Sequence, residues 1–397
     1  MTRTWVAALV PLALLAVLAG ALVALDPLAP LRAGIPPVED LAVERAVLTS
    51  EPREIRLTVV NGGPDPVTVA QVLVDEAFWP HDIEPAGPIE PLRSAAIRIP
   101  YPWVEGEPHE LVLLTSTGLT VEHTIEVAVA TPQPTSDTLV RLGLLGAAVG
   151  LLPVAIGLAW LPFVRRLRSE VLDALLAFSA GVLVFLALDA SAEALELAAD
   201  VPTAFDGVAV FGSATIVAAA ALTGIGSALR RRGRGATGAP GATGATGEPG
   251  ATSVAVLIAL GIGLHNLGEG LAIGSAYALG ELALTALLVV GFAVHNSTEG
   301  LAIATPLSRV PVRPTLLAGL ALLAGGPTIG GAWLGALAFS PTLAVAFLGL
   351  GVGAIAQVVW ELARLVGRRG GAGEPGVALG FAAGVAVMYL TALLVAA

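Results

Sequence analysis

Long apolar blocks separated by short polar segments fill the chain from residue 137 onward. Each block is close to the ~20 apolar residues that a helix needs to cross a lipid bilayer. We therefore expect a polytopic membrane domain over residues 137–397, with eight spans at about 138–162, 171–194, 207–229, 253–275, 282–304, 314–338, 342–365 and 376–396. The fold class that the pattern predicts for this domain is an all-α bundle of eight membrane helices.

Residues 35–132 alternate polar and apolar side chains instead, which is the period of half-buried β-strands. The runs 54–59 and 120–127 show this alternation, and turn residues separate the runs. Six or seven short strands at a spacing of 8–12 residues predict a small all-β, Ig-like sandwich domain. Its three histidines are scattered, so we expect surface or edge-strand positions rather than metal ligands for His81, His109 and His123.

The N-terminal segment 1–34 contains one further apolar run, residues 5–25. Its length suits a signal anchor, which we slightly favour. The small residues Ala19-Gly20-Ala21 also fit the cleavage site of a signal peptide, so this alternative stays open. Both interpretations place the β domain outside the cytoplasm.

Arginine is distributed unevenly between the loops of the membrane domain. Alternate loops contain twelve arginines and the others contain none; the twelve are Arg165, Arg166, Arg168, Arg230, Arg231, Arg232, Arg234, Arg309, Arg313, Arg364, Arg368 and Arg369. Because positively charged loops stay in the cytoplasm, we expect these loops inside and both the β domain and the C-terminus outside. The expected location is the cell membrane, crossed several times.

The arginine-rich loop 230–252 also has glycine at every third position from Gly235 to Gly250. This is the period of collagen. The run is short and contains few prolines, so we interpret it as a flexible cytoplasmic linker in preference to a triple helix.

The composition is typical of a membrane protein and excludes several kinds of partner and binding site. Hydrophobic residues make up 55% of the chain and charged residues 13%, against roughly 25% charged residues in soluble domains. The net charge of −11 argues against nucleic acid as a partner. The absence of cysteine excludes disulfides, zinc–thiolate sites and cysteine nucleophiles. With two methionines, the chain also lacks a soft sulfur site for Cu(I).

A nine-residue motif occurs twice, 30 residues apart, in the fourth and fifth predicted spans. The copies begin at His265 and His295, and seven of the nine positions are identical. In each copy a histidine and a glutamate four residues later share one helix face. Imidazoles and carboxylates from two neighbouring helices can form a divalent-metal site. The candidate ligands are His265, Asn266, Glu269, His295, Asn296 and Glu299.

Acidic residues inside the predicted spans also indicate a bound cation. A charged side chain at the centre of a membrane helix costs ~2.5–3.5 kcal/mol, and no arginine lies deep in a span to neutralise these acids. Asp189 and Glu193 share a helix face near the outer end of the second span and predict an entrance path. Gln357 and Glu361 have the same spacing near the cytoplasmic end of the seventh span and predict an exit path, although an ion pair of Glu361 with Arg364 fits equally well.

The paired motifs resemble the signatures of the ZIP (Zrt/Irt-like) metal transporters, over about residues 138–397. The resemblance implies an eight-helix bundle that moves Zn²⁺, and often Fe²⁺ or Mn²⁺, toward the cytoplasm. Matched position by position, His265, Glu269 and Glu299 correspond to the primary metal ligands of that family. The other matching positions, adjacent to these ligands or in the second span, are Asn266, His295, Asn296, Asp189 and Glu193.

The chain also departs from the family pattern. Gly268 and Thr298 stand where many members have proline before the motif glutamate. Gly326 stands where members with two metal ions have glutamate before the proline of the sixth span, so we expect one ion in the core. The resemblance does not cover the N-terminal segment or the β domain.

We therefore expect a transporter of divalent metal ions, with Zn²⁺ as the first candidate substrate and Fe²⁺, Mn²⁺ or Cd²⁺ as others. An intramembrane metalloprotease would need a His-Glu-x-x-His helix, which the sequence lacks, so we do not expect an enzyme. The alternative is a membrane metal sensor that transports nothing and signals through the β domain. The expected partners are the metal ion and the lipid bilayer; a homodimer and a partner of the β domain are left open.

Overall fold

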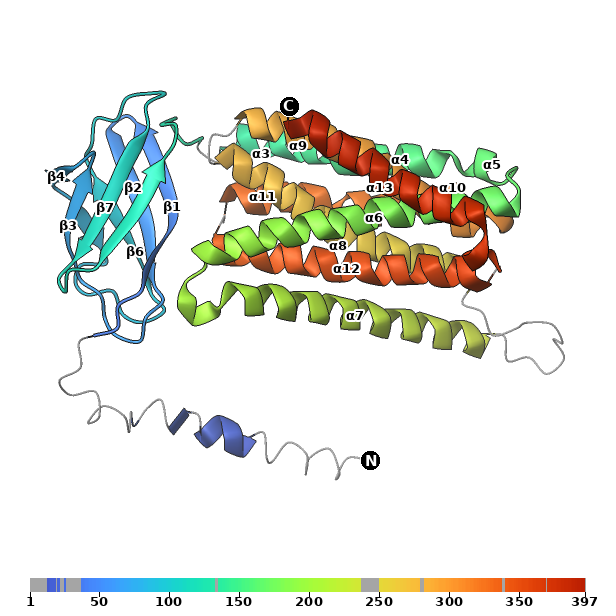
Figure 1. The fold of residues 1–397 in the computed structure, drawn as a ribbon, viewed down its shortest axis with the longest axis horizontal. Helices are drawn as coiled ribbons and strands as arrows, with labels where there is room; N and C mark the ends of the chain where they lie inside the picture. The colour runs from blue at the N-terminus through green and yellow to red at the C-terminus, as the bar shows by residue number, and fades with distance from the viewer. Residues whose placement is uncertain are drawn as a thin grey trace. The chain divides into compact units, whose positions relative to one another are not determined.

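The computed structural model describes residues 37–132, 135–236, 250–278, 282–337, 340–368 and 370–396, together with residues 13–18, 20, 21 and 25. Most of the expected anchor or signal peptide and most of the glycine repeat in loop 230–252 lie outside the described residues. Strands occupy the first described part of the chain and helices the remainder (Figure 1).

Eight strands form two antiparallel four-stranded sheets, with the orders β1-β2-β6-β5 and β4-β3-β7-β8. The predicted alternation is confirmed in β2, where Ile55, Leu57 and Val59 are buried in a core shared by both sheets. The described residues thus contain eight strands, where the sequence predicts six or seven. The strands are β1 (Leu41–Ser50), β2 (Arg53–Asn61), β3 (Val69–Val74), β4 (Ala77–Trp79), β5 (Asp82–Glu84), β6 (Ser94–Ile99), β7 (His109–Thr115) and β8 (Thr120–Ile125).

His109 does not have the surface or edge position expected of the β-domain histidines. It begins β7, an inner strand, and is 4% exposed. Its Nδ1 lies 2.8 Å from a carboxylate oxygen of Asp75, to which the Tyr101 hydroxyl also donates at 2.7 Å. The expectation was wrong because this carboxylate stabilises a buried imidazole. The hydrogen bond to Asp75 also raises the pKa of Tyr101 to about 12. His81 and His123 are partly exposed, as expected.

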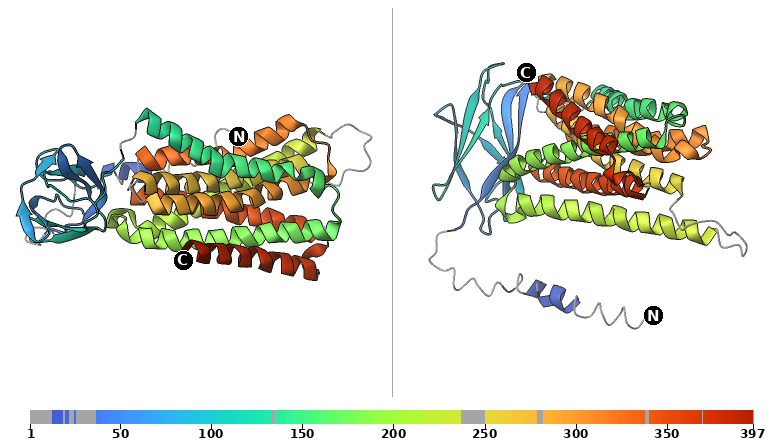
Figure 2. Two further views of the ribbon diagram at one scale, coloured as in Figure 1. Left: turned by 90° about the horizontal axis from the view of Figure 1, so that it is seen from above. Right: turned by 45° about the vertical axis from the view of Figure 1, so that its right-hand side comes forward.

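The helices lie side by side in one bundle (Figure 2). Short irregular turns interrupt the first and sixth predicted spans: η1 (Ala147–Leu151) is a π-helical turn, and α10 ends at Gly325 just before α11 begins at Pro327. The helices are α3 (Ser136–Gly146), α4 (Leu152–Ala159), α5 (Leu161–Val164), α6 (Ser169–Leu197), α7 (Gly207–Ala236), α8 (Ala251–Ala278), α9 (Leu282–Ala304), α10 (Pro314–Gly325), α11 (Pro327–Leu337), α12 (Pro341–Arg368) and α13 (Pro375–Ala396).

Seven segments of the described chain are long and apolar enough to cross a membrane, so the protein is a multi-pass membrane protein. They correspond to seven of the eight spans expected from the sequence. The remaining expected span, 282–304, coincides with helix α9, which packs within the same bundle. The seven segments are Ser136–Val164, Ser169–Asp200, Thr203–Leu229, Ala251–Ala278, Pro314–Leu337, Pro341–Arg368 and Pro375–Leu393.

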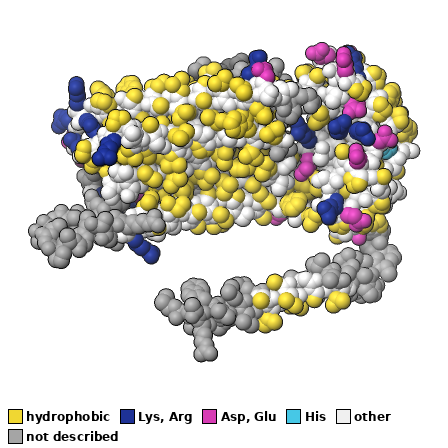
Figure 3. Space-filling model, turned by 180° about the vertical axis from the view of Figure 1, so that it is seen from behind, with side chains coloured by type: hydrophobic (Ala, Val, Ile, Leu, Met, Phe, Trp, Pro, Cys, Tyr) yellow, Lys and Arg dark blue, Asp and Glu magenta, His cyan; other side chains and the backbone are white. Residues whose placement is uncertain are grey.

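Basic side chains gather at one end of the bundle, and the surface between its ends is mainly hydrophobic (Figure 3). Two of the arginine-rich loops meet directly, because a guanidinium nitrogen of Arg165 lies 2.6 Å from the backbone oxygen of Val310. The loops that the sequence predicts on one side of the membrane therefore lie at one end of the bundle. This agreement supports the predicted grouping of the arginine-rich loops.

Four glycines bring helices α8 and α11 into close backbone contact. A Cβ atom at Gly270 or Gly274 would collide with the backbone of α11, and one at Gly331 or Gly335 would collide with the backbone of α8. Small residues at a spacing of four allow membrane helices to approach this closely. The first copy of the motif, on α8, is therefore packed tightly against helix α11.

Candidate metal centre

Three motif side chains converge in the middle of the bundle. His265 and Glu269 come from α8 and His295 from α9, and all three are at least 92% buried. The Glu269 Oε1 atom lies 3.2 Å from His265 Nε2 and 2.5 Å from His295 Nε2. Their candidate ligand atoms all lie within 4.8 Å of one another. Two imidazoles and one carboxylate that face a common point can bind a divalent metal ion.

The two motif asparagines donate hydrogen bonds to backbone oxygens of neighbouring segments, close to the places where the spans are interrupted. The Asn296 amide donates to the backbone oxygen of Val149, within η1, at 3.1 Å and to Glu269 Oε2 at 3.0 Å. The Asn266 amide donates to the backbone oxygen of Ala324, near the end of α10, at 3.1 Å. Both Oδ1 atoms are buried and have no hydrogen-bond partner among the described residues. They can therefore still accept a hydrogen bond or contact a cation.

Glu299 lies on α9, one helical turn after His295, and is 1% exposed. Neither of its carboxylate oxygens has a hydrogen-bond partner among the described residues. It is not one of the three residues whose ligand atoms converge, but its carboxylate lies near His265, Glu269 and the amide of Asn266. A buried carboxylate is costly unless hydrogen-bond donors or a cation lie close to it, so this position favours a nearby cation.

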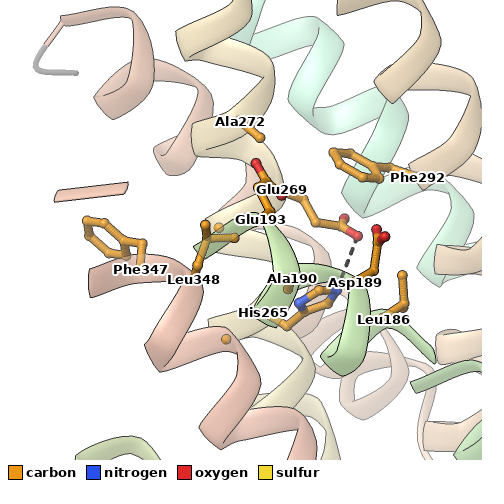
Figure 4. A pocket seen from close by; sticks show the side chains of 12 residues that line it. Leu186, Asp189, Ala190, Glu193, His265, Glu269, Ala272, Phe292, Phe347 and Leu348 are labelled. Atoms are coloured by element: carbon orange, nitrogen blue, oxygen red, sulfur yellow. Dashed lines mark ion pairs between the residues drawn. The ribbon is translucent and has the colours of Figure 1, made fainter. Parts of the chain in front are cut away.

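A narrow pocket is lined both by two of the three residues, His265 and Glu269, and by the residues of the predicted entrance path. Figure 4 shows Asp189 and Glu193 of α6 beside His265 and Glu269 in the wall of this pocket. It has about 50 Å³ of space, enough for a small ion with some water. Both α6 carboxylates are exposed, whereas the metal-centre residues beneath them are buried. The pocket is therefore acidic from its opening to its floor.

Gln357 and Glu361 lie apart from the metal centre. Thr223 of α7 donates to Gln357 Oε1 at 2.8 Å, and Glu361 Oε1 lies 3.5 Å from a guanidinium nitrogen of Arg364. The ion pair that the sequence allowed is thus present, although it is long. The same three helices, α7, α8 and α12, also share a cluster of apolar side chains, namely Leu222, Leu257, Leu260, Leu264 and Ala354.

Sequence reasoning missed two contacts of the site. The ring of Phe292 packs against the ring of His295 at 5.6 Å between centroids, and Phe292 also lines the pocket. Its position three residues before the motif histidine could have indicated this. Thr223 bonds to Gln357 from another helix, and no sequence signal indicated that pairing.

Comparison with protein-family models finds no match for this chain, and comparison with curated proteins finds none either. The ZIP resemblance therefore rests on the motifs, and the functional interpretation rests on the geometry of their residues.

Proposed function

We propose that the protein transports divalent metal ions across the membrane, as the ZIP resemblance implies, with Zn²⁺ as the main substrate. The observation that carries this proposal is the buried convergence of His265, Glu269 and His295, whose ligand atoms lie within 4.8 Å of one another. Nitrogen and carboxylate donors without sulfur suit Zn²⁺ and also allow Fe²⁺, Mn²⁺ or Cd²⁺. Glu299 supplies a second carboxylate close by to balance the charge of the ion.

The proposed path crosses the bundle from the acidic pocket to the arginine-rich end. Metal ions reach the centre past Asp189 and Glu193 and leave past Gln357 and Glu361. In this proposal α9 is the eighth span, the β domain and the C-terminus lie outside the cell, and the arginine-rich loops lie in the cytoplasm. A single ion occupies the core, because Gly326 offers no carboxylate beside the break in the sixth span.

Metal uptake into liposomes that contain the purified protein tests this function. We expect the protein to load the vesicles with Zn²⁺ well above the leak of empty vesicles, and parallel assays with Fe²⁺, Mn²⁺ and Cd²⁺ give the preference. The alternative function, a metal sensor, predicts binding without uptake. Tight Zn²⁺ binding with uptake no faster than the leak would therefore refute transport and support the sensor.

A further inference from the structure

Asn296 connects the metal centre to the interrupted backbone of the first span. It is completely buried on α9, and its side-chain nitrogen lies 3.0 Å from Glu269 Oε2 and 3.1 Å from the backbone oxygen of Val149. Both partners are acceptors, because an ionised carboxylate and a backbone carbonyl carry no hydrogen to donate. The group that faces them is therefore the amide NH₂, whose two hydrogens serve one acceptor each.

The backbone oxygen of Val149 is available because its helix is interrupted. Val149 lies in the π-helical turn η1, and its partner in a regular α-helix would be the N–H of residue 153. That residue is proline, which has no N–H. The side chain of Asn296 thus gives this buried carbonyl a hydrogen bond that the helix does not supply. In return, the carbonyl fixes the direction in which the amide faces.

The two carboxylate oxygens of Glu269 have different partners. Oε1 lies 3.2 Å from His265 Nε2 and 2.5 Å from His295 Nε2, whereas Oε2 accepts from Asn296. A metal ion between the two imidazoles therefore meets Oε1. If Oε2 turned toward the ion as well, a buried amide N–H would lose its acceptor, which is unfavourable.

The motif counterpart of Asn296 makes no equivalent contact. Asn266 donates to the backbone oxygen of Ala324, but the carboxylate of Glu299 has no hydrogen-bond partner among the described residues. The two copies of the motif therefore differ in how their glutamates are held. This difference agrees with the place of Glu269, rather than Glu299, in the converging group.

We propose that Asn296 is a positioning residue that makes the centre selective for Zn²⁺: by holding Oε2, it lets the Glu269 carboxylate bind the ion through Oε1 alone. This inference rests on the proposed function and adds how that site discriminates between its possible ions. Zn²⁺ is satisfied by two imidazoles, one carboxylate oxygen and one further ligand in a tetrahedron. Mn²⁺ prefers octahedral oxygen surroundings, so the loss of one carboxylate oxygen weakens its binding more.

Asn296→Leu tests the proposal, because leucine keeps the branched shape of the side chain and removes both donors. Calorimetric titration of the purified full-length protein with Zn²⁺, and separately with Mn²⁺, gives the ratio of the two affinities. We expect the Zn²⁺ affinity to fall about tenfold, at the lower end of the 10–100-fold loss typical of supporting groups. The Mn²⁺ affinity should not fall, since both oxygens of Glu269 can then bind the ion. The Zn²⁺/Mn²⁺ ratio should therefore fall about tenfold.

A direct ligand role for Asn296 predicts the opposite change. If its Oδ1 bound the ion, the substitution would remove an oxygen that Mn²⁺ needs more than Zn²⁺ does, and the ratio would rise. X-ray absorption of the zinc-loaded variant gives a second readout. We expect both imidazoles to remain and one oxygen neighbour to be gained. A ratio that rises or stays unchanged, or the loss of an oxygen neighbour, would overturn the positioning role.

Pro153→Ala tests the same arrangement from outside the metal centre. The new N–H can bond to the oxygen of Val149 and compete with the amide of Asn296, so we expect a smaller fall of the Zn²⁺/Mn²⁺ ratio. Pro375→Ala is the control, because Pro375 begins α13, where a backbone N–H has no partner within the helix.

The outcomes separate this inference from the function on which it rests. Each variant is compared as a monodisperse peak in size-exclusion chromatography, and Pro153→Ala decides if Asn296→Leu does not fold. Equal ratios for Pro153→Ala and Pro375→Ala would then overturn the positioning role and leave the metal centre standing. No Zn²⁺ binding by the unaltered protein would refute the proposed function and this inference with it.

Discussion

Replacing Glu269 by alanine should abolish Zn²⁺ binding at the core while the protein still inserts and folds. Its carboxylate is the group that links the centre: Oε1 lies 3.2 Å from His265 and 2.5 Å from His295, and Oε2 accepts from Asn296 at 3.0 Å. Without it, two neutral imidazoles would have to hold a dication in a medium of low dielectric constant. We expect the affinity to fall by at least about 100-fold, since even removal of indirect supporting groups costs about 10–100-fold.

Calorimetric titration of the purified protein with Zn²⁺ measures this loss. The unaltered protein should bind one core ion and release protons, which two buffers of different ionisation enthalpy reveal. Glu361→Gln is the matched control, because this carboxylate is equally buried but lies outside the converging group. It should keep near-normal core affinity and affect mainly the rate of uptake. Near-normal binding by Glu269→Ala would exclude the proposed centre.

The second large effect is expected at the contact between α8 and α11. Replacing Gly331 by valine should destabilise the bundle by about 3 kcal/mol or more, because a Cβ there would collide with backbone atoms of Leu267, Gly270 and Leu271. Backbone atoms on both sides cannot move away without separating the helices. The adjacent Gly330→Val provides the control, because its Cβ would lie 3.9 Å from the nearest described atom, a methyl group of Leu267.

Thermal unfolding in detergent, followed by size-exclusion chromatography, compares the two variants. Gly331→Val should lose its monodisperse peak at a clearly lower temperature than the unaltered protein, and Gly330→Val should stay close to it. Equal stability of both variants would show that the two helices do not pack by backbone contact at this place.

Much of the fold could be predicted from periodicity. The alternation of polar and apolar residues predicted the strands, because one face of each strand is buried. The long apolar blocks predicted the membrane helices, because the thickness of a bilayer sets their length. The break at Gly325-Gly326-Pro327 was also predictable, since proline cannot continue the hydrogen bonding of a helix. The π-helical turn at Ala147–Leu151 was not, because Gly150 and the nearby Pro153 indicate a weak point in the helix but not the kind of turn that forms there.

The candidate site was predictable in composition but not in arrangement. The repeated motif indicated which residues meet, since His265 and Glu269 share one helix face. It did not show that His295, rather than Glu299, completes the converging group, because that depends on the rotation of α9 against α8 and on side-chain rotamers. The partners of the asparagines are the backbone oxygens of Val149 and Ala324, in other spans. Only the first has a signal in the sequence, since Pro153 has no N–H to donate to the oxygen of Val149 four residues earlier.

Zinc K-edge X-ray absorption of the loaded full-length protein tests most directly whether both motif histidines hold one metal ion. We expect nitrogen and oxygen neighbours at about 2.0–2.2 Å, with the outer-shell scattering of two imidazoles. His265→Ala and His295→Ala should each remove one imidazole from the spectrum. A zinc ion surrounded by oxygen alone, or a spectrum that neither substitution changes, would contradict the proposed centre.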